Sequence, residues 1–537
     1  MSARWLIVGA GLVFLVGYLF YARWLSWWLG LDDRRPTPAH RFQDGLDFVP
    51  TSTPVLFGHH FASIAGAGPI VGPILAASYG WLGVFLWLVL GAVLAGGVHD
   101  MGSMAASLQH EGRSIGELLR QYLGPSAQRL FLAFAVATLV LVVAAFDVIV
   151  AKTFVASPPV ATASLGFLIL ALLFGLLYYR LRLPLSATTL LGLAGLILSI
   201  WLGFRFPLRL GEPLWRGILF AYIFLASVLP VWLLLQPRDY LNAFLLYALL
   251  LGALVGLFLR APAVRLPAYT GFFNALGPLF PLLFVTTSCG ALSGFHSLVA
   301  SGTTARQASR ESQARSVGYG AMLLESLLAV ISLCAVVGLT LGDYQGLLQT
   351  KGPITVFALG VGHFLSALGL SPEKGRAFAA LAVSAFALTS LDTATRVARF
   401  MLEELFSPSG QQVSTPQSRL LFTSLVVAAG VLLAFSGAWQ RIWPLMGTAN
   451  QLLAALALLA LTVWLTSVGR PSAFVKLPAF FMLAVTLTAL VLLAYRNFLS
   501  GKPLLALLAF LLLVLTLLLL RLAAHKVLFS GKPQKFV

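Results

Sequence analysis

The sequence predicts an all-α polytopic membrane protein with about 15 transmembrane helices. Of its 537 residues, 59% are hydrophobic and only 10% are charged, and the mean hydropathy is +0.93. Apolar runs of about 20 residues, the length that a helix needs to cross a bilayer, follow one another along the chain. This composition excludes a soluble globular protein, and the length of the runs excludes the alternating strands of an outer-membrane barrel.

Short charged loops separate the predicted membrane spans. The expected spans are 4–29, 55–79, 81–107, 127–151, 161–179, 184–204, 216–235, 239–259, 280–302, 315–341, 376–396, 417–437, 440–466, 475–495 and 502–523. A shorter apolar segment, 353–369, contains Gly360, Gly362 and His363, and we interpret it as a re-entrant or surface helix. The first run lacks a small-residue cleavage site and many spans follow it, so we expect it to be retained.

The basic residues indicate the orientation in the membrane. The chain carries 35 Lys and Arg against 17 acidic residues, a net charge of +18, and the larger share lies in alternate short loops. That pattern is typical of cytoplasmic loops and not of a nucleic-acid-binding surface. We therefore expect an inner-membrane protein with its N-terminus outside and its C-terminus in the cytoplasm. Cys289 and Cys334 lie in apolar runs, so neither a disulfide framework nor a CxxC metal site is expected.

The span at 55–79 has the composition of an interrupted helix. The stretch VLFGHHFASIAGAGPIVGPILAASYG contains two prolines, several glycines and two adjacent histidines. Proline removes a backbone donor, and glycine lowers the cost of leaving helical geometry. In a membrane such a break persists only inside protein or beside a water-filled cavity, and secondary transporters bind substrates at such breaks. The alternative is a kinked helix with a purely structural role.

A second interrupted span repeats features of the first. GHHFASIAGAG at 58–68 is echoed by GFHSLVASGTT at 294–304, within the predicted span 280–302. The charge pattern directs the two spans oppositely across the membrane, as an inverted repeat requires. A chance match between two helices rich in Gly and Ser is the alternative.

Five polar residues are expected on one side of the two interrupted helices. His59, His60 and His296 lie on these helices, and His99 and Asp100 lie near the inner end of 81–107. Histidine titrates near physiological pH, so a proton relay is one role, and satisfied buried histidines are the alternative. No HxxxH or HxxE spacing supports a metal site.

Two acidic residues are predicted within the membrane, where a carboxylate is costly and a functional candidate. Asp147 has Lys152 five residues further on, which is poorly placed for a helical ion pair. Glu325 is equally suited to transport and to a hydrogen bond between helices.

Hydroxyl groups cluster in FALTSLDTATRVARF, at 386–400. Thr389 and Ser390 are candidate oxygen ligands for a sodium ion. Asp392 and Arg396 have the i,i+4 spacing of a helical ion pair, and we expect them to form a structural clamp.

Two further segments carry polar residues at predicted helix ends. In LPVWLLLQPRDYLN we expect Pro237 to end a helix, with Arg238 and Asp239 at the cytoplasmic surface as a charged stop more than as a gate. Asn450 and Gln451 are able to bond across helices, and packing is the role that we favour for them.

Seven runs between about residues 50 and 460 resemble one protein family. They are FGHHFASIAGAGPIVGP, AGGVHD, LPVWLLLQPRDYLN, CGALSGFHSLVASGTT, YGAMLLES, ALTSLDTATRVARF and WPLMGTANQLLAALAL. Together they are similar to the carbon starvation protein A family of bacterial and archaeal inner-membrane transporters. The resemblance implies uptake of peptides or, in some members, of pyruvate with protons. This chain is shorter than many members, so its substrate stays open.

The resemblance also implies an architecture. The family is placed in the amino acid–polyamine–organocation (APC) superfamily, which has a five-plus-five inverted repeat with broken first and sixth core helices. On this pattern the chain divides into an N-terminal extra helix and loop, a first repeat, an inserted helix pair, a second repeat and C-terminal extra helices, at 1–54, 55–205, 206–279, 280–466 and 467–537. Thr389 and Ser390 then fall on core helix eight, where sodium-coupled members bind sodium.

We therefore expect a secondary transporter for a short peptide or a small carboxylate such as pyruvate. Half-helix N-termini favour anions, so the substrate carboxylate is expected near Gly66–Gly68 and Ser288–Gly290. The candidate substrate-binding residues are His59, His60, Gly66, Ala67, Gly68, Ser288, Cys289, Gly290 and His296. The candidate residues for ion or proton coupling are Ser63, Gly66, Thr389, Ser390, Asp147 and Asp392.

The expected partners are the small-molecule substrate and the lipid bilayer, with no nucleic acid, no bound metal and no cofactor beyond a coupling proton or sodium ion. Two rivals stay open. A channel would need rings of filter residues, which the sequence does not repeat. An intramembrane enzyme would use His59, His60, His99, Asp100 and His296 to hold a catalytic metal.

Overall fold

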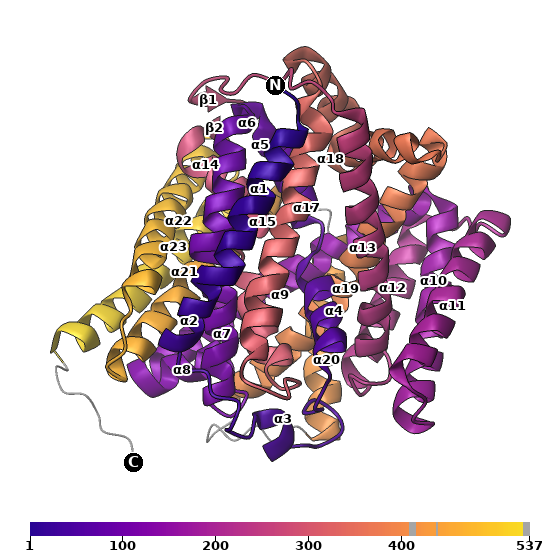
Figure 1. Ribbon diagram of the computed structural model, residues 1–537. Coiled ribbons are helices and arrows are strands. Elements are labelled where there is room, and N and C mark those ends of the chain that lie inside the picture. Colours follow the sequence, from indigo (N-terminus) through magenta and orange to yellow (C-terminus); the bar gives the residue numbers. More distant parts are fainter. Residues whose placement is uncertain (407–414, 436–438, 530–537) are drawn as a thin grey trace.

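The protein is a bundle of long helices (Figure 1), described by a computed structural model for residues 1–406, 415–435 and 439–529. We call the end at which Met1 lies the top face, and the end at which the short helix α3 (Pro38–Arg41) lies the bottom face. Residues 436–437 of the predicted span 417–437 and residues 530–537 of the predicted C-terminal segment lie outside the described residues.

The N-terminal third is helical almost throughout. Its elements are α1 (Arg4–Val16), a π-helical turn at Gly17–Tyr21, α2 (Ala22–Trp28), α3, α4 (Thr53–Ile64), α5 (Gly68–Ala76) with a 3₁₀ turn at Ala77–Tyr79, α6 (Trp81–Leu86), a π-helical stretch at Trp87–Gly96, α7 (Gly97–Gln109), α8 (Ile115–Leu123), α9 (Pro125–Ala156), α10 (Pro158–Gly175) with a π-helical turn at Leu176–Arg180, and α11 (Leu185–Arg205).

The rest of the chain adds one small hairpin and further helices. The elements are α12 (Glu212–Val228), α13 (Leu235–Arg260), the antiparallel strands β1 (Phe273–Asn274) and β2 (Gly277–Pro278), α14 (Leu279–Thr286), α15 (Ser288–Ala291), α16 (Gly294–Val299), π-helical turns at Ala300–Thr304 and Ala314–Tyr319, α17 (Gly320–Val337), α18 (Leu341–Leu365) with a 3₁₀ turn at Ser366–Leu368, α19 (Pro372–Phe406), α20 (Pro416–Phe435), α21 (Trp439–Ser467), α22 (Ala473–Leu499) and α23 (Pro503–Phe529).

The prediction of an all-α polytopic membrane protein is confirmed. Among the described residues, 12 helices are long and apolar enough to cross a membrane, or up to 13 if the bent pair of α4 and α5 is one span. The predicted spans 216–235, 280–302 and 502–523 are outside that count. The first forms a 17-residue helix, the second is divided into short pieces, and the third contains the shorter apolar helix Ala506–Leu522.

Helix α18 passes the same test of length and composition, although we predicted a surface or re-entrant helix at 353–369. It is bent at Gly352, where φ is +71°. In its first half the Tyr344 hydroxyl donates to the carbonyl of Ile74, at the end of α5. Just after its second half, Ser366 accepts a hydrogen bond from Arg260, at the end of α13. Both halves therefore meet helix ends on the top face, which agrees with a surface segment that begins earlier than predicted.

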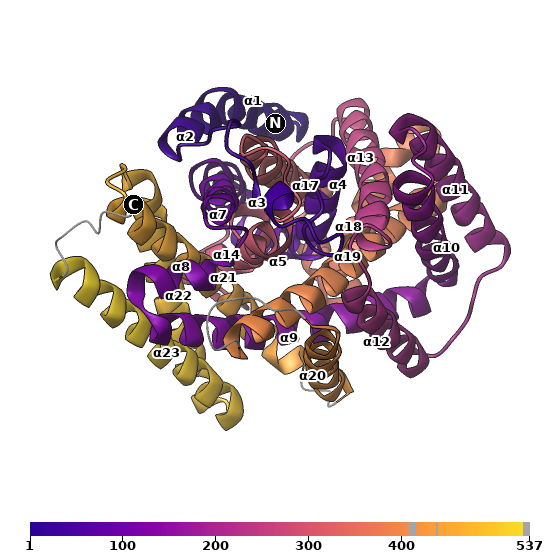
Figure 2. The ribbon, with the colours of Figure 1, turned by 90° about the horizontal axis from the view of Figure 1, so that it is seen from below.

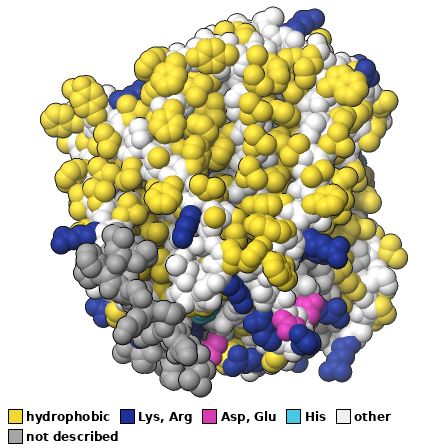
Figure 3. Space-filling model, turned by 60° about the vertical axis from the view of Figure 1, so that its left-hand side comes forward, with side chains coloured by type: hydrophobic (Ala, Val, Ile, Leu, Met, Phe, Trp, Pro, Cys, Tyr) yellow, Lys and Arg dark blue, Asp and Glu magenta, His cyan; other side chains and the backbone are white. Residues whose placement is uncertain are grey.

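The surface of the bundle matches a bilayer environment. Large apolar side chains such as Phe20, Leu190, Ile197 and Leu432 are at least half exposed. Figure 3 shows hydrophobic side chains over the middle of one side and many Lys and Arg side chains near the bottom edge. Lipid covers such a hydrophobic band, and the concentration of basic residues at the bottom face agrees with the charge pattern in the sequence.

The two interrupted helices run in opposite directions, as predicted. The backbone N–H of Thr51, just before α4, donates to the carbonyl of Gln307, just after the second interrupted helix. At the other face the Tyr79 hydroxyl donates to the carbonyl of Gly277, just before α14. Seen from below, α5 and α14 lie inside the bundle, whereas α1 with α2, α10 with α11 and α22 with α23 lie at its rim (Figure 2). How the five-plus-five repeat divides the chain stays a prediction.

Candidate substrate cavity and buried polar clusters

A cavity of about 410 Å³ lies between the two interruptions. Its lining comes from both broken helices and from α9, α19, α21 and α22. The residues closest to the breaks in sequence are Gly66, Gly68, Pro69, Ser288, Cys289, Ser293 and Phe295, and Phe146, Ser390 and Asn450 complete this part. The volume falls in the range of small-molecule sites, about 300–1,000 Å³. We refer to this space as the central cavity.

The first break separates α4 from α5 and bends the helix by 44°. Ala65 leaves helical geometry with ψ +60°, and α5 begins at Gly68 with Pro69 in its first turn. The Ser390 hydroxyl donates to the freed carbonyl of Ser63 at 2.9 Å.

The N-terminus of α5 borders the cavity. Pro69 has no N–H, and the Ile70 N–H donates to the carbonyl of Ala67. The Gly68 N–H is therefore the one in this first turn without a helical partner.

Close packing explains the glycines around this break. A Cβ atom at Gly66 would lie 2.8 Å from the Ser390 hydroxyl oxygen, and one at Gly68 would lie 2.4 Å from the Cys289 sulfur. At Gly72 a Cβ would lie 2.4 Å from the carbonyl oxygen of Thr286. Gly68 and Gly72 thus let the two broken helices touch, and Gly66 lets α19 approach the first break.

The second break is longer than predicted. We expected it at Ser288–Gly290, but those residues belong to the helical turn α15, and the chain is extended at Leu292 and Ser293. The interruption therefore extends from Thr287 to Ser293.

Two side chains of α21 occupy the second break. The Asn450 Oδ1 atom accepts a hydrogen bond from the Phe295 N–H at 2.8 Å, and its Nδ2 donates to the Ser293 hydroxyl at 3.0 Å. Gln451 Nε2 donates to the carbonyl of Leu292 at 3.1 Å. Asn450 and Gln451 therefore bind the freed backbone at the start of α16 and do more than pack between helices, the role that we favoured from the sequence.

The cavity extends toward the top face. Leu276 of the β1–β2 hairpin and Arg496, Asn497, Ser500 and Lys502, at and beyond the end of α22, also line it. Arg496 donates to the carbonyl of Leu276 at 2.7 Å. The end of α22, the turn after it and the β1–β2 hairpin thus line the top of the central cavity.

The predicted substrate residues divide into two groups. Gly66, Gly68, Ser288 and Cys289 line the central cavity, as does Ser390. Ala67 and Gly290 belong to the breaks but are not among the lining residues, and a Cβ at Gly290 would lie 2.6 Å from the Ala329 side chain. The histidines are fully buried on the bottom halves of the broken helices and do not line this cavity. We predicted that a single cavity contains all three histidines, and the central cavity contains none of them.

His59 belongs to a buried cluster built around Arg238, which we call the Arg238 cluster. His59 Nδ1 lies 2.7 Å from Asp239 Oδ2. Arg238 Nε donates to Asp239 Oδ1 at 3.0 Å and Nη2 donates to Asp392 Oδ1 at 3.0 Å. The Tyr222 hydroxyl donates to Asp392 Oδ2 at 2.6 Å. The permanent charge of Arg238 thus lies between two carboxylates.

The sequence-based prediction for this segment was wrong. Arg238 and Asp239 are buried and not at the cytoplasmic surface, and Pro237 lies in the first turn of α13 and does not end a helix. Proline is tolerated there because the N–H groups of a first turn lack helical partners.

His296 belongs to a second buried cluster, with His99, Asp100 and Glu325, which we call the Glu325 cluster. His296 Nδ1 lies 2.9 Å from Asp100 Oδ2, and His99 Nδ1 lies 2.7 Å from Asp100 Oδ1. His296 Nε2 lies 3.2 Å from Glu325 Oε2, without the geometry of a hydrogen bond. His60 is separate, since its Nδ1 lies 2.8 Å from the Thr304 hydroxyl. The Glu325 cluster, unlike the Arg238 cluster, contains no arginine or lysine.

The candidate sodium ligands are only partly together. Ser63 and Ser390 meet, and the Ser63 hydroxyl lies 3.2 Å from that of Thr393. The Thr389 hydroxyl instead donates to the carbonyl of Ala385 in its own helix. Asp392 belongs to the Arg238 cluster.

Asp147 is buried away from these groups, on α9. Neither of its carboxylate oxygens has a hydrogen-bond partner among the described residues. The charged groups that face it are Arg216 and Glu212 of α12. Lys152, which we considered as a partner of Asp147, lines a cavity at the top face.

The predicted clamp between Asp392 and Arg396 is wrong. Arg396 binds Asp47, in the loop before α4, at 2.8 Å, and Arg399 lies 3.6 Å from the same carboxylate. Burial raises the pKa of Asp47, but Arg399 and Arg396 lower it by more, so the pKa lies below its ordinary value. The charged form of Asp47 is thus held by both arginines and joins this loop to α19 at the bottom face.

Among the described residues, no group of three or more His, Cys, Asp or Glu side chains could hold a metal ion.

Sequence comparison assigns the chain to a family. The family model described as "Carbon starvation protein CstA" matches residues 2–350 and 344–489. The Peptide transporter CstA of Escherichia coli (strain K12) is 36% identical, over 91% of this chain and 81% of the relative. The Pyruvate/proton symporter BtsT of the same strain is 32% identical, over the same shares of both chains.

The fold resembles a solved transporter. The structure of the Eremococcus coleocola manganese transporter, in complex with an aromatic bis-isothiourea compound, matches with a TM-score of 0.52 at 14% identity. The match covers 90% of this chain and 98% of that one, and it shows similarity of fold alone. The family match and the two relatives show that this chain belongs to the carbon starvation protein CstA family.

Proposed function

We propose that this protein imports a small carboxylate or a short peptide across the cytoplasmic membrane together with protons. The observation that carries the proposal is the central cavity, because both helix breaks line it. Its relatives, a peptide transporter and a pyruvate/proton symporter, support transport and argue against an enzyme. The top face would be outside, since many basic residues lie at the bottom.

The substrate carboxylate would bind at the N-terminus of α5. A helix N-terminus presents N–H groups and a partial positive charge, both of which favour an anion. The corresponding end of α16 is occupied by Asn450. The substrate would therefore be held at Gly68, with Cys289 and Ser390 beside it, and not at both breaks as the sequence suggested.

Proton coupling would use the Glu325 cluster. In the Arg238 cluster a permanent cation lies between the two carboxylates and stabilises their charged forms, so protonation of either one would weaken a buried ion pair. The Glu325 cluster contains two carboxylates and two histidines, all of which are titratable. Such groups in a membrane are candidates for proton relays.

Sodium coupling is the second candidate, favoured by the meeting of Ser63 and Ser390. The Ser390 hydroxyl and the Ser63 carbonyl would both be ligands, but here they are bonded to each other at 2.9 Å. A sodium ion would have to break that bond, so the arrangement supports protons better.

The cavity would be exposed to the two sides of the membrane in turn. In this structure it reaches residues of the top face, whereas the bottom side is closed by both buried clusters and by the Asp47 contacts. Opening the bottom would require Asp47 to leave Arg396 and Arg399.

Uptake into proteoliposomes tests the proposal. Labelled pyruvate and glycylglycine are offered separately, each under a proton gradient and under a sodium gradient. We expect accumulation of at least one compound under the proton gradient. Absence of uptake of both compounds under either gradient would contradict the proposed function.

The coupling step is tested with Glu325→Gln. This variant should lose proton-driven accumulation but keep the exchange of labelled for unlabelled substrate, because exchange needs no net proton movement. Glu111→Gln, on the bottom surface, is the matched control and should behave like the unmodified protein. Normal accumulation by Glu325→Gln would place the coupling elsewhere.

A further inference from the structure

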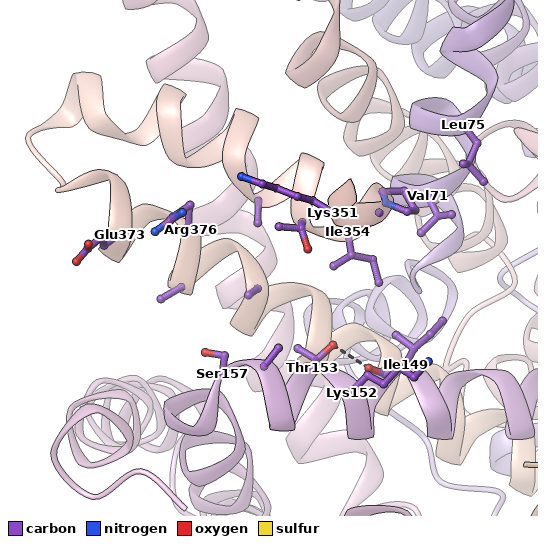
Figure 4. Close-up of a pocket in the computed structure, with 17 residues that line it drawn as sticks. Val71, Leu75, Ile149, Lys152, Thr153, Ser157, Lys351, Ile354, Glu373 and Arg376 are labelled. Atoms are coloured by element: carbon purple, nitrogen blue, oxygen red, sulfur yellow. Dashed lines mark hydrogen bonds between the residues drawn. The ribbon is translucent and has the colours of Figure 1, made fainter. Parts of the chain in front are cut away.

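A second cavity, of about 980 Å³, lies beside the central cavity at the top face (Figure 4). It is bounded by the C-terminal end of α9, the bend of α18, the start of α19 and one face of α5. We call it the vestibule. Three of its lining residues are basic, namely Lys152, Lys351 and Arg376, and only Glu373 is acidic.

We propose that the vestibule is a second, weaker binding site for carboxylates, in which Lys152, Lys351 and Arg376 bind the substrate before it enters the central cavity. This site deepens the proposed function and rests on it for its role in transport. The binding itself is independent of transport and is measurable in the purified protein.

The basic residues come from three separate helices. Lys152 lies near the end of α9, Lys351 next to the bend of α18, and Arg376 in the second turn of α19. All three side chains are exposed, and all line the same hollow. A concave surface with charge of one sign raises the local concentration of the opposite ion. The excess of cations over Glu373 therefore favours an anion.

One side of the vestibule is apolar, which suits the rest of a small organic acid. Val71, Leu75, Ile149 and Ile354 all line it, and Figure 4 shows them on the side away from Glu373. Sites of this composition bind the apolar part of a ligand by burial and its polar group by a few charged or polar contacts. An inorganic anion would contact only the basic side chains and would gain nothing from the apolar lining.

The vestibule is continuous in position with the central cavity. Val71 and Leu75 line both spaces, so α5 forms their shared wall. The N-terminus of the same helix borders the central cavity at Gly68. A carboxylate that passed Val71 and Leu75 would move along α5 toward the end of the helix that favours anions.

The bend of α18 places one of the cations. At Gly352 φ is +71°, a conformation that glycine adopts without strain, and a Cβ there would meet no other atom within 4 Å. Lys351 directly precedes this bend and Pro353 follows it. The position of Lys351 thus depends on the bend and not on a straight helix.

The charge of the vestibule has a consequence for selectivity. Pyruvate has a net negative charge at neutral pH, whereas a dipeptide such as glycylglycine carries one charge of each sign. Electrostatic attraction acts on net charge at a distance and is screened by salt. The vestibule should therefore favour pyruvate over glycylglycine, most strongly at low ionic strength.

Equilibrium binding of labelled pyruvate to the purified protein tests the proposal. We expect two sites in the unmodified protein. The variant Lys152→Gln/Lys351→Gln/Arg376→Gln should weaken the low-affinity site by about tenfold at about 0.01 M salt and by much less at about 1 M salt. The control Lys374→Gln removes an exposed cation of α19 that does not line the vestibule, and it should leave both sites unchanged.

The two levels of the proposal fail in different ways. A single pyruvate site, or two sites that the triple variant leaves unchanged at low salt, would overturn the vestibule, even if uptake is normal. A weak site that is lost in the triple variant, in a protein that transports neither test compound, would support the vestibule and contradict the proposed function. Glutamine is polar and the substituted positions are exposed, so the variants are expected to fold.

Discussion

The two helix breaks differ in how their freed backbone groups are bound. At the first break, Ser390 binds the carbonyl end of α4, and the N-terminus of α5 borders the central cavity. At the second break, Asn450 and Gln451 bind backbone groups within the interruption and directly after it, at Leu292 and Phe295. The first break therefore has its helix N-terminus available for a ligand, whereas the second is satisfied by the protein itself.

This difference shows that similar broken helices need not have equal roles. An unpaired backbone group in a membrane is costly, so each break must find partners. Asn450 supplies them permanently to α16. At α5 a substrate carboxylate would supply them only while it is bound, which links occupancy of the central cavity to the state of the first broken helix.

The largest expected effect comes from filling the first break. Gly68→Leu would place side-chain atoms where Cys289 now lies, because even a Cβ would lie 2.4 Å from its sulfur. We expect uptake to fall by about 100-fold or more, since misplacement by about 1 Å at a site already has that cost. Gly11→Leu, on α1, is the control, because a Cβ at Gly11 meets no atom within 4 Å. Uptake by Gly68→Leu close to that of the control would show that the first break is not the substrate site.

The second expected effect comes from emptying the second break. Asn450→Ala removes the acceptor for the Phe295 N–H and the donor to Ser293. An unpaired buried group costs about 1–3 kcal/mol, so we expect a clear decrease in the unfolding temperature in detergent. Asn450→Asp keeps the acceptor, so its unfolding temperature should lie between those of the unmodified protein and Asn450→Ala. An unchanged unfolding temperature for Asn450→Ala would mean that water or another side chain binds this backbone.

The smallest expected effect comes from the hydroxyls of α19. Ser390→Ala leaves the Ser63 carbonyl without its donor and should lower the free energy of unfolding by about 0.5–1.5 kcal/mol. Thr389→Ala is the comparison, because the Thr389 hydroxyl donates to Ala385 in its own helix and accepts from Asn242 of α13, and neither of these residues belongs to the first break. If protons drive transport, neither substitution should change uptake, and adding a sodium gradient should have no effect. Sodium-stimulated uptake that Ser390→Ala abolishes would favour sodium coupling.

The breaks were predictable from sequence because their causes are local. Proline and glycine act on the backbone within one turn, so 55–79 and 280–302 are recognisable as interrupted from composition alone. The partners of the breaks were not predictable. Nothing in the order of residues says that Asn450, more than 150 positions away, binds the N–H of Phe295.

Charged residues were misplaced for the same reason. Asp392 and Arg396 have ideal spacing for a helical pair, yet each binds a residue distant in sequence, Arg238 and Asp47. A helical pair is worth only about 0.2–0.5 kcal/mol, so buried partners from other helices decide the contacts. Arg238 was placed at the surface because a charge beside a proline is typical of a helix end. Its partners Asp239 and Asp392 allow it to be buried.

Chemical labelling of Cys289 tests most directly whether the substrate binds between the two helix breaks. Cys289 lines the central cavity beside Gly68, whereas Cys334 is buried elsewhere and is replaced by alanine for the experiment. The rate of modification by a small thiol reagent is measured in purified protein with increasing pyruvate or glycylglycine, whichever compound is taken up. We predict that the transported compound slows the modification, with half-protection near its KM, and that it no longer does so in Gly68→Leu. Modification at an unchanged rate with saturating transported substrate would contradict the claim that the substrate binds between the two breaks.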